Sequence, residues 1–203
     1  MVPVQLTGPR LAIREFHHTP GDVDGLHSVF GDPETARYLP FEARDRETCA
    51  DQIELYLEEA QKDPRTVYRL AVTLREDGDD VPPIGNAVLG IEGRRAAFIG
   101  YALRRDTWGR GYASEITRLL CGFGFETLRL HRLAARVDPA NTASSRVLTK
   151  AGFQLEGRIR HDLYLRDTWH DALQYSLLED EWEQVKHQAV EQASGPGPGP
   201  DAD

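Results

Sequence analysis

The sequence lacks the features of several protein classes. It has no long uncharged apolar run that would suit a membrane span. Its start, MVPVQLTGPRLAIREF, also lacks the basic flank and apolar stretch of a secretory signal. We therefore expect a cytoplasmic protein that makes no membrane contact.

Cysteine is scarce, and no pattern of metal ligands is present. Cys49 and Cys121 are the two cysteines of the chain, and their separation does not match a metal site. Because both fall in predicted helices of a chain without a secretory signal, we expect two buried thiols rather than a disulfide. His131, His161 and His170 are scattered without ligand spacing. The sequence predicts no metal site.

The chain also lacks an excess of basic residues. It has 24 Lys and Arg against 33 Asp and Glu, a formal net charge of -9. Proteins that bind nucleic acid usually display a strongly basic surface, so we do not expect nucleic acid as a partner. A cationic partner fits the charge better. An acidic surface also serves solubility alone, so charge leaves the partner open.

Alternating polarity, turn signals and helical spacing divide the chain into strands and helices. Strands are predicted over residues 10–16, 68–76, 83–93, 96–105, 132–139, 154–165 and 170–178. Helices are predicted over residues 20–30, 32–38, 46–62, 113–127 and 141–151, with Asp32 and Asn141 at helix starts and Gly152 at a helix end. This order predicts an α+β (mixed α/β) domain with helices against a largely antiparallel sheet.

The length of the chain suits a single domain with one core, which we assign to residues 1–193. The last stretch, SGPGPGPDAD over residues 194–203, alternates Gly with Pro and ends acidic. Such a composition cannot bury enough apolar surface to offset the entropy of ordering. We therefore expect a disordered tail there.

The most informative pattern runs from Tyr101 to Glu126, YALRRDTWGRGYASEITRLLCGFGFE. A strand end is followed by a glycine-bearing loop and then directly by a helix. Such a loop leaves backbone N–H groups unpaired at the positive end of the helix dipole, where an anion such as a phosphate can bind. Gly109 and Gly111 are equally compatible with a tight strand-to-helix turn, so the glycines alone leave both interpretations open.

A second segment, NTASSRVLTKAGF over residues 141–153, follows this pattern. Together the two segments resemble the core motifs of the GCN5-related N-acetyltransferase (GNAT) superfamily, whose members move an acyl group from coenzyme A to an amine. The loop from Trp108 to Ala113, WGRGYA, resembles the form found in the RimJ- and RimL-like branch. The closing YLRDTWHDALQYSLLEDEW, residues 164–182, resembles that branch too, so the resemblance covers residues 6 to 182.

The resemblance implies the GNAT fold, a twisted and largely antiparallel central sheet flanked by helices, with two strands splayed at the acyl-CoA site. It implies acetyl-CoA as the co-substrate and a primary amine as the acceptor, either a protein N-terminus or a small molecule. A bulkier acyl group such as succinyl stays open, and so does assembly as a homodimer. The alternative is a coenzyme-A-binding sensor or interaction module that no longer catalyses.

The resemblance also implies a set of site residues. Leu103 is expected to donate its backbone N–H to the thioester carbonyl. Asn141 and Ser144 are expected near the cofactor, and Asn141 is equally suited to be a helix N-cap. The whole set predicted to bind the cofactor is Leu103, Trp108, Gly109, Arg110, Gly111, Tyr112, Ala113, Ser114, Asn141, Ser144 and Arg146.

Trp108 departs from the Gln or Arg that usually begins the superfamily's loop. Two other positions depart from the family pattern, and both concern proton transfer. Leu148 stands where many members have a Tyr that protonates the leaving thiolate, so Ser144 is our candidate acid, although a Ser in a first helical turn is often only tolerated there. Phe98 stands where the branch often has a Glu that acts as the base. Glu92 is our candidate base. The alternatives are that Glu92 is only an exposed residue before the Gly93 turn, and that ordered water takes the proton from the amine.

Overall fold

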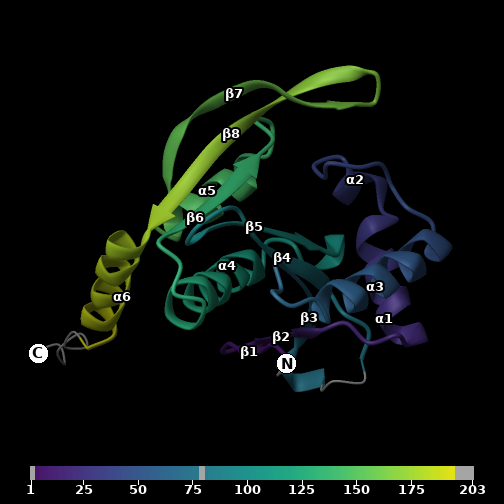
Figure 1. Ribbon diagram of the computed structural model, residues 1–203, viewed down its shortest axis with the longest axis horizontal. Helices are drawn as coiled ribbons and strands as arrows, with labels where there is room; N and C mark the ends of the chain where they lie inside the picture. Colours follow the sequence, from purple (N-terminus) through teal and green to yellow (C-terminus); the bar gives the residue numbers. More distant parts are fainter. Residues whose placement is uncertain (1–2, 78–80, 195–203) are drawn as a thin grey trace, which may run out of the picture.

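The computed structural model describes residues 3–77 and 81–194, which form a sheet covered by helices on both faces (Figure 1). The sheet has eight strands in the order β1-β2-β3-β4-β5-β6-β8-β7. Every neighbouring pair is antiparallel except β5 with β6. The predicted α+β domain with a largely antiparallel sheet is confirmed. The strands are β1 (Gln5–Thr7), β2 (Leu11–Glu15), β3 (Val67–Leu74), β4 (Gly85–Ile91), β5 (Ala96–Leu103), β6 (Arg132–Val137), β7 (Gln154–Leu165) and β8 (Thr168–Leu178).

The helices begin largely where the sequence predicts. They are α1 (Pro20–Phe30), α2 (Pro33–Ala36), α3 (Arg46–Ala60), α4 (Tyr112–Gly122), α5 (Thr142–Lys150) and α6 (Glu179–Ser194). Short 3₁₀ turns cover Arg75–Asp77 and Arg105–Thr107. In the part of the chain that the structure describes, no helix is long and apolar enough to cross a membrane.

Each face of the sheet has its own apolar cluster because side chains alternate along the strands. On one face, Ile116 and Leu120 of α4 pack against strand residues such as Leu70 and Leu89. On the other face, α1 and α3 cover a smaller cluster that includes Ile53. Figure 1 shows α4 on one side of β3–β5 and α1 with α3 on the other. Cys49 and Cys121 are free and buried in these clusters, as predicted.

The parallel pairing of β5 with β6 is short. It joins Ala96, Ala97 and Phe98 to residues 132–134, after which the two strands diverge. β5 continues to Leu103 along β4, while β6 continues along β8. The sheet therefore consists of a part containing β1–β5 and a part containing β6–β8, with a gap between them beside the second half of β5.

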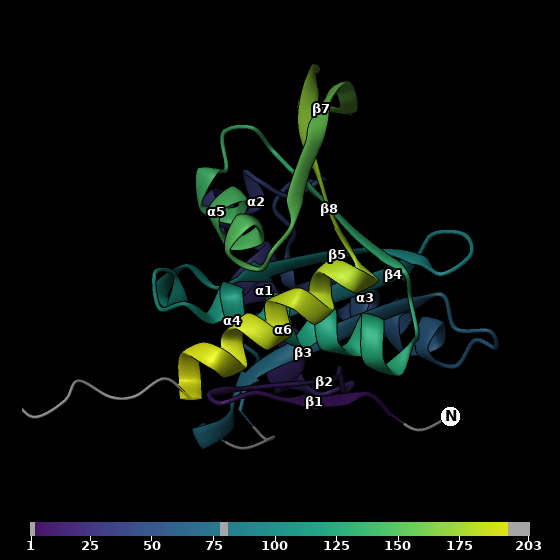
Figure 2. The same ribbon diagram turned by 90° about the vertical axis from the view of Figure 1, so that its left-hand side faces the viewer.

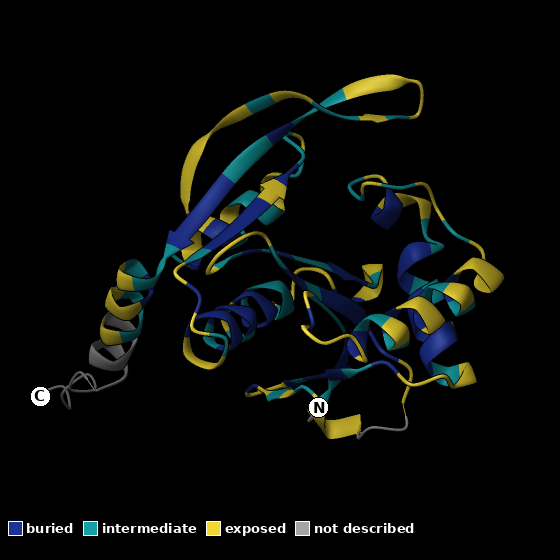
Figure 3. Cartoon of the chain, viewed as in Figure 1, coloured by how far each residue is buried: buried dark blue, intermediate teal, exposed yellow. Residues whose placement is uncertain are grey.

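The β7–β8 hairpin rises from the rest of the sheet in both views (Figures 1 and 2). Most of β7 is exposed, as its yellow stretches in Figure 3 show. At its tip, Arg166 donates from Nη2 to the carbonyl oxygens of Ala36 (2.9 Å) and Phe41 (3.2 Å). The tip thus contacts the segment that contains α2.

Several boundaries differ from the sequence prediction. The helix predicted over residues 113–127 is α-helical only to Gly122 and continues as a π-helical turn, Phe123–Thr127. In this turn Gly124 lies so close to Leu133 that an added Cβ would be 3.0 Å from its side chain. β1 and α6 were not predicted. α6 includes Ser194, so the predicted tail loses its first residue, and residues 195–203 lie outside the described residues.

Candidate active site

The loop between β5 and α4 has an exposed turn at residues 108–111. Gly109 (φ 74°) and Gly111 (φ 78°) adopt the left-handed backbone conformation that favours glycine. A Cβ on Gly109 would have no heavy atom within 4 Å, so the space above the loop is open. These features leave the backbone of the loop accessible to a ligand.

The N-terminus of α4 differs from those of its neighbours. α1, α2, α3 and α5 each have a side-chain oxygen that accepts a hydrogen bond from a first-turn N–H, supplied by Thr19, Asp32, Asp45 and Asn141. In α4 the cap residue is Gly111, which has no side chain to do this. The first-turn amides of α4 are therefore available to an anion. This donor set fits the diphosphate of coenzyme A.

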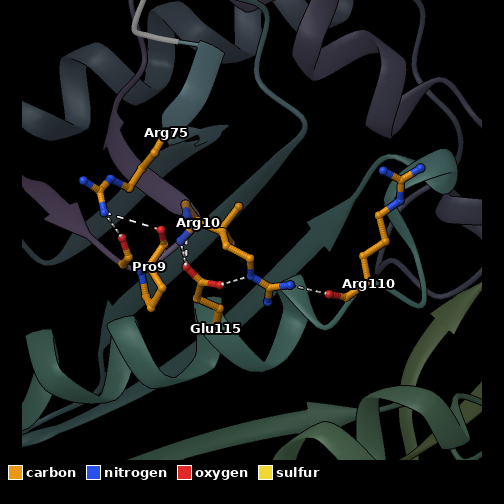
Figure 4. A network of polar contacts seen from close by, with 7 residues as sticks. Pro9, Arg10, Arg75, Arg110 and Glu115 are labelled. Atoms are coloured by element: carbon orange, nitrogen blue, oxygen red, sulfur yellow. Dashed lines mark hydrogen bonds and ion pairs between the residues drawn. The ribbon is translucent and has the colours of Figure 1, made fainter.

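Glu115 lies in the first turn of α4, where its buried carboxylate fastens the helix to the start of β2 (Figure 4). Oε1 accepts from the backbone N–H groups of Arg10 (2.8 Å) and Leu11 (2.9 Å), and Oε2 accepts from Arg10 Nε (2.9 Å). Burial alone would raise the pKa of Glu115, but these hydrogen bonds and the Arg10 charge outweigh it and lower the pKa. The carboxylate is therefore ionised at neutral pH.

Arg10 also reaches the loop itself. Its Nη1 donates to the carbonyl oxygen of Arg110 (2.7 Å), and its guanidinium lies 4.8 Å from the centre of the Tyr112 ring. Trp108 binds the other end of the loop to β5, because its indole Nε1 donates to the carbonyl oxygen of Leu103 (2.8 Å). The loop is thus held at both ends by side chains.

The backbone of Leu103 faces the gap beside β6. Arg104 N donates to Ile84 O (2.8 Å), so the backbone of Arg104 faces β4. Because successive residues of a strand face opposite sides, the preceding residue, Leu103, has its N–H and C=O on the side away from β4. The β5–β6 ladder ends at Phe98, so it supplies no partner for this N–H. The Leu103 N–H is therefore directed into the gap between the diverging strands.

Tyr101 and Ser144 meet across this gap. Tyr101 lies two residues before Leu103 in β5, and its Oη donates to Ser144 Oγ (3.3 Å) in the first turn of α5. Burial raises the pKa of Tyr101, against the lowering effect of the bond to Ser144. Asn141 Oδ1 accepts from Ser144 N (3.0 Å), so Asn141 is the N-cap that the sequence predicted.

The structure brings some predicted residues together and separates others. Leu103, Ser144 and the loop residues 108–114 border the gap or the N-terminus of α4. Arg146 is exposed on α5. Glu92 is exposed at the β4–β5 turn, where its N–H donates to the Ala96 carbonyl (2.7 Å), and Ala96 is seven residues from Leu103, about 23 Å at about 3.3 Å per residue. Glu92 is therefore not part of this group, because the β4–β5 turn lies at the start of β5 and Leu103 lies at its end.

The sequence interpretation did not single out the Tyr101 side chain, which contacts the candidate residue Ser144. The sequence did contain a signal for it. Side chains alternate along a strand, so those of Tyr101 and Leu103 lie on the same face of the sheet. Leu148 is buried in the main apolar cluster, and its aliphatic side chain has no proton to donate. Among the described residues, no group of three or more His, Cys, Asp or Glu side chains could hold a metal ion.

Comparison with known proteins shows the family of this chain. A family model described as an acetyltransferase (GNAT) domain matches residues 10–154. The chain belongs to the GNAT acetyltransferase family. The predicted family and its enzyme class are thereby confirmed. The uncharacterised N-acetyltransferase p20 of Bacillus licheniformis is 33% identical over 168 residues, which cover 79% of this chain and 89% of that protein.

Solved structures share the GNAT fold. RimJ of Mycobacterium smegmatis, in complex with CoA-disulfide, matches with a TM-score of 0.76 and 22% identity, covering 95% of this chain and 98% of that one. Spermidine N-acetyltransferase of Vibrio cholerae, in complex with CoA and spermine, has a TM-score of 0.73 and 18% identity over 87% of this chain and 99% of that one. The predicted GNAT fold is confirmed.

Proposed function

We propose that this GNAT protein transfers an acetyl group directly from acetyl-CoA to a primary amine, without a covalent enzyme intermediate. The observation that carries the proposal is the uncapped N-terminus of α4 beside the gap where β5 leaves β6. In this site the backbone amides from Arg110 to Ser114 bind the diphosphate of the donor. Acetyl-CoA supplies the activated acyl group as a thioester.

The residues at the gap align the donor and handle one proton. The Leu103 N–H donates a hydrogen bond to the thioester carbonyl oxygen. Ser144 Oγ, which already accepts a hydrogen bond from Tyr101 Oη, gives its own proton to the departing sulfur. Tyr101, whose phenol is protonated at neutral pH, can then return a proton to Ser144. The proton that the acceptor nitrogen loses as the amide forms passes through water to Tyr101 and restores its phenol.

The amine acceptor must lose a proton before it attacks. Leu103, Tyr101 and Ser144 supply no carboxylate to take it, and Glu92 is remote from them. We therefore assign this deprotonation to water, so that the acceptor binds and reacts as its neutral form. On this basis kcat/KM for the acceptor rises with pH until the pH reaches the pKa of the amine.

Two classes of acceptor remain in the proposal, a protein N-terminus and a small amine. Relatives in fold include a spermidine N-acetyltransferase and the RimL ribosomal L7/L12 alpha-N-protein acetyltransferase. The net charge of -9 favours cationic acceptors of either class. A CoA-binding module without catalysis is the second candidate, supported by Leu148 and Phe98, which carry no proton-transfer group.

Thiol release from acetyl-CoA tests the proposal. The wild-type chain is assayed with polyamines, amino sugars and amino-terminal peptides, and with the buffer alone as a control for hydrolysis. We expect thiol and acetylated amine to form in equal amounts with at least one class of acceptor. Tight CoA binding with no thiol release above the buffer control for any acceptor would support the non-catalytic candidate instead.

A further inference from the structure

Arg10 precedes β2 and lies a hundred positions from the phosphate-binding loop in sequence, yet its side chain contacts that loop (Figure 4). Nη1 donates to the Arg110 carbonyl at 2.7 Å, while Nε donates to Glu115 Oε2 at 2.9 Å. One planar guanidinium thus joins the loop to the first turn of α4. The proposed acetyl transfer assigns no part to this residue.

The bond to the Arg110 carbonyl fixes the direction of a loop N–H. In a trans peptide the C=O and the following N–H point in opposite directions. Because the Arg110 oxygen points to Arg10, the N–H of Gly111 points away from Arg10. If this peptide turned over, a carbonyl oxygen with its partial negative charge would take the place of a donor. Glycine at 111 does not oppose such a turn as a side chain would.

Arg10 also offsets an unfavourable charge. The Glu115 carboxylate lies in the first turn of α4, near the amides that would bind a diphosphate. An unpaired carboxylate there would repel the ligand. Its ion pair with Arg10, at 2.9 Å, reduces this repulsion while leaving the two backbone bonds of Glu115 in place.

We propose that Arg10 is a positioning residue for the diphosphate of coenzyme A, acting by orienting the Arg110–Gly111 peptide and neutralising Glu115. The inference rests on the proposed coenzyme A site and deepens it. Lysine cannot replace Arg10 fully, because an ammonium group lacks the planar fork that serves Arg110 and Glu115 together.

The test compares three variants by calorimetric titration with CoA. Arg10→Met keeps the apolar stem and removes the donors, and Arg10→Lys keeps only the charge. Arg75→Met is the matched control, because Arg75 donates to the carbonyls of Gly8 (3.0 Å) and Pro9 (3.4 Å) in the same turn but not to the loop. We expect Kd for CoA to rise about tenfold in Arg10→Met and about threefold in Arg10→Lys, with less than about a twofold change in Arg75→Met.

A second donor separates positioning from a general loss of structure. Acetyl-pantetheine carries the thioester without the diphosphate, so kcat/KM for it should change less than about twofold in Arg10→Met while kcat/KM for acetyl-CoA falls about tenfold. Thermal denaturation shows whether each variant is folded. If Arg10→Met does not fold, Arg10→Lys is used for the same comparison of the two donors.

The outcomes distinguish the two proposals. A wild-type chain that does not bind CoA overturns the proposed function and this inference together. A wild-type chain that binds CoA, with Arg10 variants indistinguishable from Arg75→Met, overturns the role of Arg10 alone. Equal losses for acetyl-CoA and acetyl-pantetheine would also overturn it, because the effect would then not depend on the diphosphate.

Discussion

The two parts of the sheet are built differently. In the loop part, β1–β5 with α4, side chains from distant segments fix the loop after β5: Arg10 and Glu115 at one end, Trp108 at the other. In the hairpin part, β6–β8 with α5, most of β7 is exposed, and Arg166 joins the hairpin tip to the backbone near α2. Long-range side-chain contacts thus hold the loop that we propose for the donor, whereas the exposed hairpin has few such contacts and is where we expect the acceptor to bind.

The aromatic side chains of the hairpin illustrate this contrast. Tyr164 and Trp169 are each 55% exposed, whereas Tyr101 on β5 is largely buried and bonded to Ser144. Exposed aromatics on a strand that bridges to another segment can change with little cost to the core. Substitutions in the loop part should therefore affect donor binding and stability, and those in the hairpin part should affect the acceptor.

The largest effect is expected at Gly111. A valine there would be strained at φ 78°, and its Cβ would lie 3.4 Å from Arg10 Nη2, so the loop backbone that we propose binds the phosphates could not keep its conformation. Losing two hydrogen bonds to a charged phosphate, at about 2 kcal/mol each, weakens CoA binding on the order of 10³-fold. Calorimetric titration measures this loss. Gly93→Val is the control, since Gly93 has a similar φ of 74° at the β4–β5 turn. Equal losses of CoA affinity in both variants would show that the loop does not bind CoA.

The next effect is expected where the two parts meet. Ser144→Ala removes the proposed proton donor, so kcat should fall about 100-fold while Kd for CoA changes little. Ser145→Ala is the neighbouring control, because Ser145 Oγ is buried without a hydrogen-bond partner among the described residues. Removal of this hydroxyl should leave kcat unchanged, and the free energy of unfolding should stay equal or rise slightly. Steady-state kinetics on both variants measures this difference in kcat. A Ser144→Ala enzyme with the kcat of the wild type would show that Ser144 is not the proton donor.

Glu115 tests how firmly the loop part is held. Because hydrogen bonding lowers its pKa in the folded state, its ionised form stabilises the fold above its ordinary pKa of 4.5, and this stabilisation disappears as the pH falls through the lowered value. Glu115→Gln should reduce the free energy of unfolding at pH 7 by about 2 kcal/mol. Urea denaturation from pH 7 to pH 3 should show the difference from wild type shrinking in acid.

Glu47→Gln is the control for that experiment, since Glu47 is an exposed carboxylate in the first turn of α3. It should change the free energy of unfolding by less than about 0.5 kcal/mol. A difference between wild type and Glu115→Gln that stays constant down to pH 3 would mean that ionisation of Glu115 does not stabilise the fold.

The smallest effect is expected at the hairpin tip. Arg166→Ala removes the bonds to the carbonyls of Ala36 and Phe41, so KM for the acceptor should change about threefold while KM for acetyl-CoA stays the same. Arg160→Ala, at another exposed arginine of the hairpin, should change neither. A change in donor KM alone would contradict the division between the two parts.

Prediction from sequence worked where local chemistry decides. Asp32 and Asn141 cap helices because their short side chains reach first-turn amides, and Gly152 ends α5 with φ 94°. The glycine loop and α4 were likewise found from neighbouring residues. These features depend on a few consecutive positions, so the sequence reveals them.

Contacts between distant segments could not be predicted in this way. The Arg10–Glu115 pair joins residues more than a hundred positions apart, and the Tyr101–Ser144 bond depends on where β5 leaves β6. Glu92 was expected to reach the cleft from the strand before β5, but the β4–β5 turn puts it opposite Ala96, at the far end of β5 from Leu103. The Arg10–Glu115 and Tyr101–Ser144 contacts follow from how distant strands and helices pack together, which a local pattern does not determine. The position of Glu92 follows from the local turn at Gly93 and could have been predicted.

The most direct measurement compares the affinity of the wild-type chain for CoA with its affinity for pantetheine, which lacks the diphosphate. If the loop at residues 108–111 and the N-terminus of α4 bind the diphosphate, CoA should bind at least about 100-fold more tightly than pantetheine. Affinities that agree within a few-fold would contradict this, because the donor would then be held by its pantetheine arm and not by the loop.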